Sequence, residues 1–208
     1  KNFKNKINFN QYPSLEAQIS SLSDDIAYNN HDIQDGIKAK LFSVKDLIEI
    51  DFFNEIYKSN KQNLKRKNLD ILIYQIIRDS IDLMVKDLIN NTLKNIKTYK
   101  IKNLRNVYNW PDNLVSFSNK FKNIENEIRS FLRKKMYNNK NVLKKNNEGK
   151  KIVKKLFEKV SKKPKKFLTL EKLKDGKHRA ISDFISGMTD RYAINLYNKI
   201  KWIYLIYI

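Results

Sequence analysis

The sequence predicts an all-α protein, and the prediction rests on its turn residues and its hydrophobic periodicity. It has 208 residues but only 4 glycines and 3 prolines, so the frequent turn signals of a many-stranded sheet are missing. Apolar residues recur at helical spacing in several long segments, and no segment shows a convincing strand alternation. Hydrophobic residues make up 41% and charged residues 31%, which is typical of a globular chain. We therefore expect long helices packed as an irregular bundle.

Three helices are expected in the first half of the chain. Ser14 and Ser43 are placed to cap the first two, over residues 15–41 and 44–57, because a serine oxygen accepts a hydrogen bond from a free amide of the first turn. The third is expected over residues 68–96. The apolar stripe of the first helix should comprise Leu15, Ile19, Leu22, Ile26, Ile33 and Ile37. The core-facing seam of the third should comprise Tyr74, Ile77, Ile81, Met84 and Leu88.

The second half of the chain predicts three further helices separated by polar segments. Trp110-Pro111 marks a break before a helix that is expected over residues 121–137. The Lys- and Asn-rich residues 138–149 are expected to form an exposed turn, and residues 150–160 to be helical again. A basic linker over Lys162–Lys166 leads to a last helix over residues 179–199.

The composition also narrows the class of partner. There is no cysteine, which excludes a disulfide scaffold and a thiolate metal site and fits a reducing cytoplasm. No segment approaches the roughly 18 apolar residues of a membrane span, so no membrane association is expected. The formal net charge of +21 favours a polyanionic partner, either nucleoside triphosphates or nucleic acid. The alternative is that many of the lysines form solvated surface, and the two are evenly balanced.

The first helix carries the residues that are most suggestive of chemistry. Asp24, Tyr28 and Asp32 are spaced four residues apart. Positions four apart on a helix stay within roughly 40° of each other, so the three share a face roughly opposite the apolar stripe. Two carboxylates and a phenol in register suit a hard metal ion together with a hydroxyl-bearing ligand. The alternative is the polar face of an ordinary surface helix, and spacing alone does not exclude it.

The sequence around these residues resembles a known family. Residues 13–18, PSLEAQ, followed by residues 23–36, SDDIAYNNHDIQDG, resemble the signature helix of the bacterial dGTPase-like proteins of the HD superfamily. Residues 179–193, RAISDFISGMTDRYA, resemble the C-terminal helix of that family, and Met136-Tyr137 is the best point of similarity between the two. The resemblance implies the C-terminal half of a helical HD-superfamily protein. Residues 1–42 would end the catalytic core, and residues 43–208 would form the C-terminal helical domain.

The resemblance also implies an activity and a set of roles. Proteins of this family are deoxynucleoside triphosphate triphosphohydrolases, which release inorganic triphosphate and a deoxynucleoside from a dNTP substrate such as dGTP. A divalent metal (Mg, Mn or Fe) is held there by a His, by an adjacent His-Asp pair and by a later Asp, and the match places the later Asp at Asp24. The residues that recognise the sugar 3′-hydroxyl match Tyr28 and Asp32. The family further implies a homo-oligomer.

The other metal ligands of the family have no counterpart in this chain. The first His and the His-Asp pair are expected upstream of Lys1. His31-Asp32 spells the letters of that pair, but neighbouring helical side chains point about 100° apart, so we expect His31 to be solvated. One carboxylate does not retain a catalytic metal. No catalytic set is therefore complete, and the isolated 208-residue chain is expected to be inactive.

Other roles stay open from the sequence. Lys177, His178 and Arg179 enter the second matched segment and are candidates for nucleotide contacts, although a solvated basic loop explains them as well. The basic runs at residues 65–67 and 162–166 favour an alternative function, the binding of single-stranded nucleic acid. A third reading is a catalytically inactive subunit that pairs with an intact paralogue.

Overall fold

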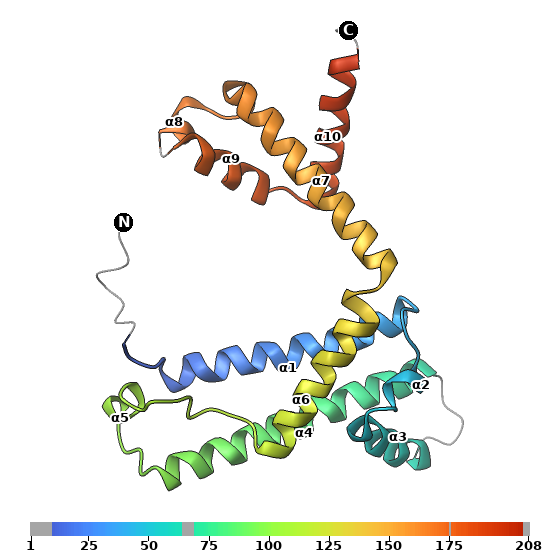
Figure 1. Ribbon diagram of the computed structural model, residues 1–208. Coiled ribbons are helices and arrows are strands. Elements are labelled where there is room, and N and C mark those ends of the chain that lie inside the picture. The colour runs from blue at the N-terminus through green and yellow to red at the C-terminus, as the bar shows by residue number, and fades with distance from the viewer. Residues whose placement is uncertain (1–9, 64–68, 175, 206–208) are drawn as a thin grey trace. The chain divides into compact units, whose positions relative to one another are not determined.

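The computed structural model describes residues 10–63, 69–174 and 176–205, and every regular element in these ranges is a helix. The predicted all-α fold is confirmed. The chain divides into two compact units, Lys1–Asn139 and Lys140–Ile208 (Figure 1). The boundary predicted between residues 42 and 43 falls inside the first unit. Its assignment to two parts of the family fold stays a prediction.

The first unit is built on two long helices, α1 (Leu15–Lys38) and α4 (Leu69–Thr98), which pack against each other. The helix α6 (Asn119–Leu132) crosses them and packs on α1, and α3 (Asp51–Asn63) packs on α4 (Figure 1). Two short helices, α2 (Val44–Leu47) and α5 (Leu104–Tyr108), lie in the connections.

The core of the first unit draws on every one of its long helices. Ile33 of α1, Phe53 of α3, Met84 of α4 and Ile128 of α6 are all fully buried in one cluster. Each side chain of this size contributes roughly 1.5–3 kcal/mol when it leaves water. Because this cluster holds the apolar side of α1, the opposite side of α1 is the one that faces outward.

Serine caps explain where the helices begin, and one cap corrects a prediction. Ser14 accepts a hydrogen bond from the amide of Ala17, as predicted for the start of α1. Ser43 and Asp46 form a reciprocal capping box at α2. The single helix predicted over residues 44–57 is wrong, because α2 ends at Leu47 and the chain turns before α3 begins at Asp51. The turn allows the buried side chains of both short segments to reach the same core.

The second unit consists of α7 (Lys140–Lys162), η3 (Pro164–Lys166), α8 (Leu170–Leu173), α9 (Lys177–Ser186) and α10 (Asp190–Leu205). Its smaller core contains Val160, Leu168, Ala180 and Ile181. None of the helices in the described parts of either unit is long and apolar enough to cross a bilayer.

Two predictions about the second unit are wrong in their boundaries. The expected turn over residues 138–149 is mostly the first half of α7, although its side chains are largely exposed as expected. Lysine is a good helix former, so a polar segment without proline can continue a helix in solvent. The expected helix over residues 179–199 is two helices, α9 and α10, and Gly187 caps the end of α9.

Two apolar side chains depart from their predicted burial. Ile19 belongs to the predicted stripe of α1 but is 45% exposed, and Tyr74 belongs to the predicted seam of α4 but is 54% exposed. The other members of both sets are buried or half-buried. Tyr74 instead lies on the outer side of α4, with the Lys38 ammonium 5.2 Å from its ring centre.

Replacing a helical glycine by alanine should have opposite effects on stability at two positions, Gly36 and Gly149. A Cβ atom at Gly36 would lie 2.3 Å from a ring carbon of Phe42, a buried side chain packed edge-on against Phe131. A Cβ atom at Gly149 would meet nothing within 4 Å. Gly36→Ala should therefore lower the free energy of unfolding by about 1–3 kcal/mol. The control, Gly149→Ala, should raise it by about 1 kcal/mol. Calorimetric unfolding of both variants checks this, and a stabilised Gly36→Ala protein would contradict the packing described.

Candidate functional site

The outward face of α1 carries the three residues that the sequence singles out. Asp24 is exposed, Tyr28 is 58% exposed, and Asp32 is half-buried. They lie opposite the side that contributes Ile26 and Ile33 to the core. None of the three is packed into the interior, so each can contact a ligand or another segment of protein.

Asp32 does not stand alone on this face, because a second tyrosine reaches it from a distant part of the chain. The Tyr137 hydroxyl donates a hydrogen bond to Asp32 Oδ2, and the two residues are 105 positions apart. The pKa of Tyr137 is raised, first because its phenol is partly buried and then because it donates to the Asp32 carboxylate. Tyr28 lies near enough to raise that pKa further. The three side chains therefore form one polar cluster, which we call the phenol–carboxylate cluster.

The cluster has acceptor and donor positions that a ligand can use. An ionised carboxylate has two oxygens and about four acceptor positions, so Asp32 can accept from a ligand hydroxyl while Tyr137 occupies one position. The phenol of Tyr28 can donate or accept, and more than half of that side chain is open to solvent. The phenol of Tyr137 is protonated at neutral pH and donates to Asp32, and its raised pKa extends this state to more alkaline pH. The arrangement suits the recognition of a neutral hydroxyl group.

An irregular helical turn brings Tyr137 to this position. After α6 the chain continues as a π-helical segment, η2 (Arg133–Tyr137). Such wide turns are uncommon and are frequent at functional sites. Lys135, in the middle of η2, contacts Asp46 Oδ1 at 2.6 Å. That contact and the hydrogen bonds from Ser43 hold the pKa of Asp46 well below its usual range. An acidic residue of the α2 capping box thus contacts the turn that presents Tyr137.

A charged group lies one helical turn before the cluster. Arg129 of α6 donates to Asp25 of α1 at 3.0 Å, and it also contacts Glu125 within its own helix. The contact with Glu125 is an ion pair by distance, but its geometry does not satisfy a hydrogen bond. We regard it as an electrostatic contact for that reason. Asp25 follows Asp24 in the chain, so a guanidinium is held close to the turn that carries the predicted metal ligand.

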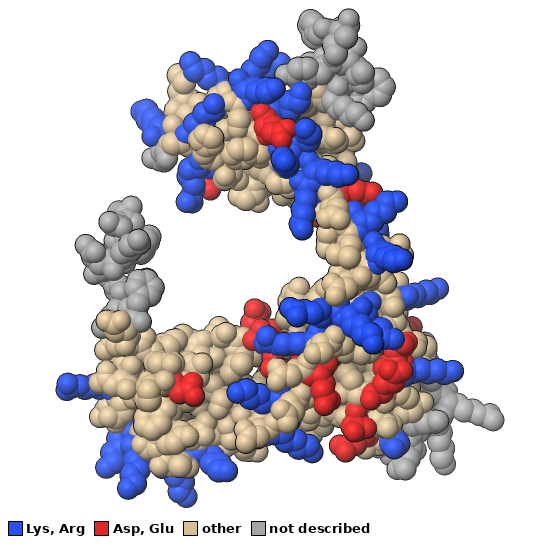
Figure 2. Space-filling view, viewed as in Figure 1, with Lys and Arg blue, Asp and Glu red and all other residues tan. Residues whose placement is uncertain are grey.

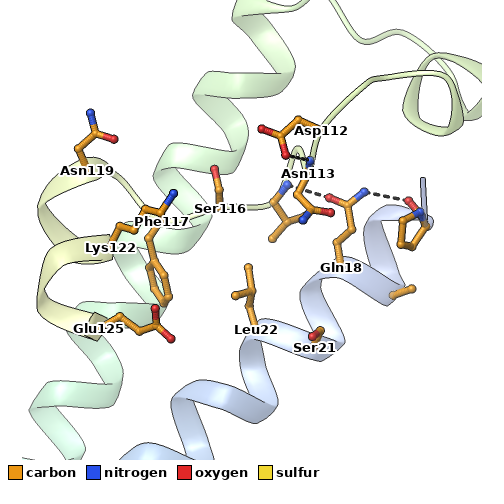
Figure 3. A pocket seen from close by; sticks show the side chains of 13 residues that line it. Gln18, Ser21, Leu22, Asp112, Asn113, Ser116, Phe117, Asn119, Lys122 and Glu125 are labelled. Atoms are coloured by element: carbon orange, nitrogen blue, oxygen red, sulfur yellow. Dashed lines mark hydrogen bonds between the residues drawn. The ribbon is translucent and has the colours of Figure 1, made fainter. Parts of the chain in front are cut away.

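A cavity of about 540 Å³ lies beside the first half of α1, between α6 and the chain segment that precedes it (Figure 3). Its wall depends on Gln18, which is buried. The Gln18 Oε1 accepts from the amides of Leu114 and Val115, at 2.9 and 3.0 Å, and its Nε2 donates to the Pro13 carbonyl at 2.8 Å. Gln18 therefore joins α1 to a segment almost 100 residues later. The lining residues do not include the phenol–carboxylate cluster.

The described residues do not by themselves fit a metal centre. They contain no group of three or more His, Asp or Glu side chains that could hold an ion. His31 is exposed on α1, as expected for a solvated side chain. The predicted role of Asp24 as a metal ligand therefore stays a prediction, because a metal would need ligands from elsewhere.

The basic candidates lie in the second unit. Lys177, His178 and Arg179 form the first turn of α9, and all three are exposed. Arg179 already donates to the carboxylate of Asp183 at 2.8–2.9 Å, and the ring of His178 lies 6.0 Å from that of Phe157. Their role in nucleotide binding stays a prediction. The other basic run, residues 65–67, lies outside the described residues.

Sequence reasoning missed three residues that help to shape this region: Gln18, Arg129 and the role of Tyr137. All three are polar, and each contacts a residue about 100 positions away. Helical periodicity reports only the neighbours within one helix, so it contains no signal for such contacts. The resemblance at Met136-Tyr137 was the one available hint.

A family model and a set of curated relatives match this chain. Residues 115–199 match the model of the phosphohydrolase-associated domain, which includes the segments that carry Arg129 and Tyr137. Over nearly its whole length the chain is related to proteins named deoxyguanosinetriphosphate triphosphohydrolase-like protein. The resemblance that the sequence predicts is confirmed.

The relatives come from several bacteria. The chain is 69% identical over 196 residues to the protein of Pelagibacter ubique (strain HTCC1062), which is 94% of this chain and 53% of the relative. It is 36% identical over 194 residues to a protein of Leptospira interrogans, covering 90% and 51% of the two chains. It is 34% identical over 205 residues to a protein of Rickettsia typhi, covering 96% and 53%. The chain thus spans about half the length of the curated relatives it matches.

Proposed function

We propose that this chain is the C-terminal half of a dNTP triphosphohydrolase of the dGTP type, and that it binds the sugar end of the nucleotide. The complete protein would release inorganic triphosphate and a deoxynucleoside by metal-assisted hydrolysis in the cytoplasm. The names of the relatives support the reaction class. The observation that carries the proposal is the phenol–carboxylate cluster, in which Tyr28 and Asp32 face outward while Tyr137 holds the carboxylate.

Within this proposal each residue of α1 has a distinct task. Asp32 accepts a hydrogen bond from the sugar 3′-hydroxyl, and the phenol of Tyr28 donates to the oxygen of the same hydroxyl. A nucleotide that lacks the hydroxyl leaves both groups without that partner, which makes its binding unfavourable. Lys177 and His178, in the second unit, stay candidates for nucleotide contacts, and Arg179 could join them only by leaving Asp183.

The described residues of this chain do not supply enough ligands to hold the metal. Asp24 would be one of its ligands, and the remaining ligands would come from the part of the longer protein that this chain does not represent. Because the described residues hold no metal-binding group of their own, the chain alone should not turn over a dNTP.

The decisive experiment restores the missing half. The upstream segment of the Pelagibacter ubique relative is joined to residues 1–208, and triphosphate release from dGTP and from its 2′,3′-dideoxy analogue is measured with divalent metal. The joined protein should hydrolyse dGTP, whereas the 208-residue chain should not. Asp32→Asn should lower kcat/KM for dGTP about 10–100-fold, because a charged hydrogen bond is removed. It should affect the dideoxy analogue far less.

The control is Glu55→Gln, which neutralises an exposed carboxylate of α3. It should leave kcat/KM unchanged. The complete Pelagibacter relative is assayed beside the joined protein, so that an inactive upstream segment is recognised. The proposal fails if the joined protein hydrolyses dGTP and the dideoxy analogue equally well, or if triphosphate appears with the isolated chain.

A second function is favoured by the surface of the second unit. The first half of α7 is exposed almost throughout, and lysines crowd it at positions 140, 144, 145, 150 and 151. The lysines of the predicted linker, at positions 162, 163, 165 and 166, are exposed as well. Figure 2 shows Lys and Arg side chains spread over the visible surface of this unit. We infer that this basic surface binds single-stranded nucleic acid through its phosphates.

Fluorescence anisotropy with a labelled single-stranded oligonucleotide tests the second function. Affinity should fall steeply between 50 and 200 mM salt, by about 10²-fold or more for several phosphate contacts. Replacing the four linker lysines by glutamine should weaken binding, while Asp24→Ala should leave it intact. Equal binding by the glutamine variant would remove the basis for this function.

A further inference from the structure

Two side chains of η2 reach elements that are distant in the sequence. Tyr137 donates to Asp32 of α1, and the Lys135 ammonium contacts Asp46 Oδ1 of α2 at 2.6 Å. Both side chains belong to one π-helical turn, so a movement of Lys135 also moves the backbone that carries Tyr137. A turn of this kind is uncommon, and an uncommon backbone conformation persists where the surrounding structure holds it.

The ion pair between Lys135 and Asp46 is better enclosed than the others. Among the ion pairs that the described residues form with one another, it alone has both side chains less than one third exposed, at 31% and 29%. In each of the others at least one side chain is more than half exposed. Water screens an exposed pair strongly and an enclosed pair less, so this pair is better able to hold two elements together.

Asp46 is a well-oriented partner because both of its carboxylate oxygens are in use. Its Oδ2 accepts from the Ser43 amide at 2.8 Å and from the Ser43 hydroxyl at 2.6 Å, while its Oδ1 accepts from Lys135. The next residue, Leu47, is buried in the core of the first unit. A rotation of the carboxylate away from Lys135 would also disturb its hydrogen bonds to Ser43.

The connection that carries Asp46 is packed against α1 and α6 as well. Phe42, between α1 and α2, is buried, and its ring packs edge-on against that of Phe131 in α6, with 4.8 Å between the ring centres. The same ring lies against Gly36 of α1, at a place that a Cβ atom would occupy. Asp46 therefore has a defined position relative to α1, the helix that carries Asp32.

We propose that Asp46 and Lys135 are positioning residues for the candidate site, and that their ion pair holds η2 in the turn from which Tyr137 donates to Asp32. A second step rests on the proposed function. With Tyr137 bound to one oxygen, the remaining acceptor positions of Asp32 are directed at the sugar 3′-hydroxyl, so the ion pair contributes to the selection of nucleotides that carry it. An ion pair that only stabilised α2 would leave the Tyr137 hydrogen bond and this selectivity unchanged.

The ionisation of Tyr137 in the 208-residue chain tests the first step without any catalysis. Carbon NMR of ring-labelled tyrosine follows each phenol as the pH rises, and Tyr137→Phe identifies the resonance among the 11 tyrosines. Lys135→Met should lower the pKa of Tyr137 toward the ordinary value of 10.0, because the phenol loses its hold on the Asp32 carboxylate. Removal of a positive charge by itself would raise that pKa, so the sign separates positioning from a direct electrostatic effect.

Three further variants serve as controls. Asp46→Asn removes the ion pair from the other side and should also lower the pKa of Tyr137, whereas Lys135→Arg keeps a cation and should leave it high. The matched control, Lys134→Met, makes the same change at an exposed neighbour in η2 and should not lower it. A Tyr137 pKa that stays high in Lys135→Met, or falls equally in Lys134→Met, overturns the proposal. Loss of helix content by circular dichroism in both Lys135→Met and Asp46→Asn overturns it as well, because the pair would then support the whole fold.

The joined protein tests the second step. The ratio of kcat/KM for dGTP to that for the 2′,3′-dideoxy analogue should fall about tenfold in Lys135→Met and stay within about twofold in Lys134→Met. If the joined protein shows no preference for dGTP, the proposed function fails, while the pKa of Tyr137 still decides the positioning role. An unchanged ratio in a Lys135→Met protein whose Tyr137 pKa has fallen would overturn the second step alone.

Discussion

The hydrogen bond from Tyr137 to Asp32 is the interaction on which the candidate site depends. It joins the outward face of α1 to the turn that follows α6. The half-buried phenol of Tyr137 also determines how the carboxylate is oriented, because one of the carboxylate oxygens is committed to it. The remaining acceptor positions, with Tyr28 beside them, are then available to a ligand.

The position of Tyr137 is in turn a consequence of the π-helical turn η2. Within this turn, Lys135 contacts Asp46 and Tyr137 donates to Asp32. Asp46 serves twice, as a capping residue of α2 and as the partner of Lys135, which is why the pKa of Asp46 is held so low. A local irregularity of the backbone is thus stabilised by two polar contacts on the same unit.

The sequence predicts well what depends on neighbours within a helix. The start of α1 at Ser14, the outward face that carries Asp24, and the burial of Met84 and Leu88 all follow from capping and periodicity. The break after α9 was missed, although Gly187 is the residue type that commonly ends a helix.

Contacts between distant segments could not be predicted, because no pattern among neighbouring residues reports on them. Gln18 accepts hydrogen bonds from two amides of a segment nearly 100 residues away, and Lys135 of η2 contacts Asp46 of α2. A buried glutamine or a widened turn is compatible with many tertiary environments, so spacing alone cannot single it out. The exposure of Tyr74 was missed for a related reason. Because α4 carries apolar residues on both sides, periodicity alone does not show which side packs into the core.

The most direct test of this account is a double-mutant cycle on Asp32→Asn and Tyr137→Phe. Unfolding in urea is followed in a Trp202→Phe background, so that Trp110 alone reports on the first unit. The account predicts a coupling free energy of about 1 kcal/mol or more between the two substitutions. Additive effects, with a coupling indistinguishable from zero, would contradict it.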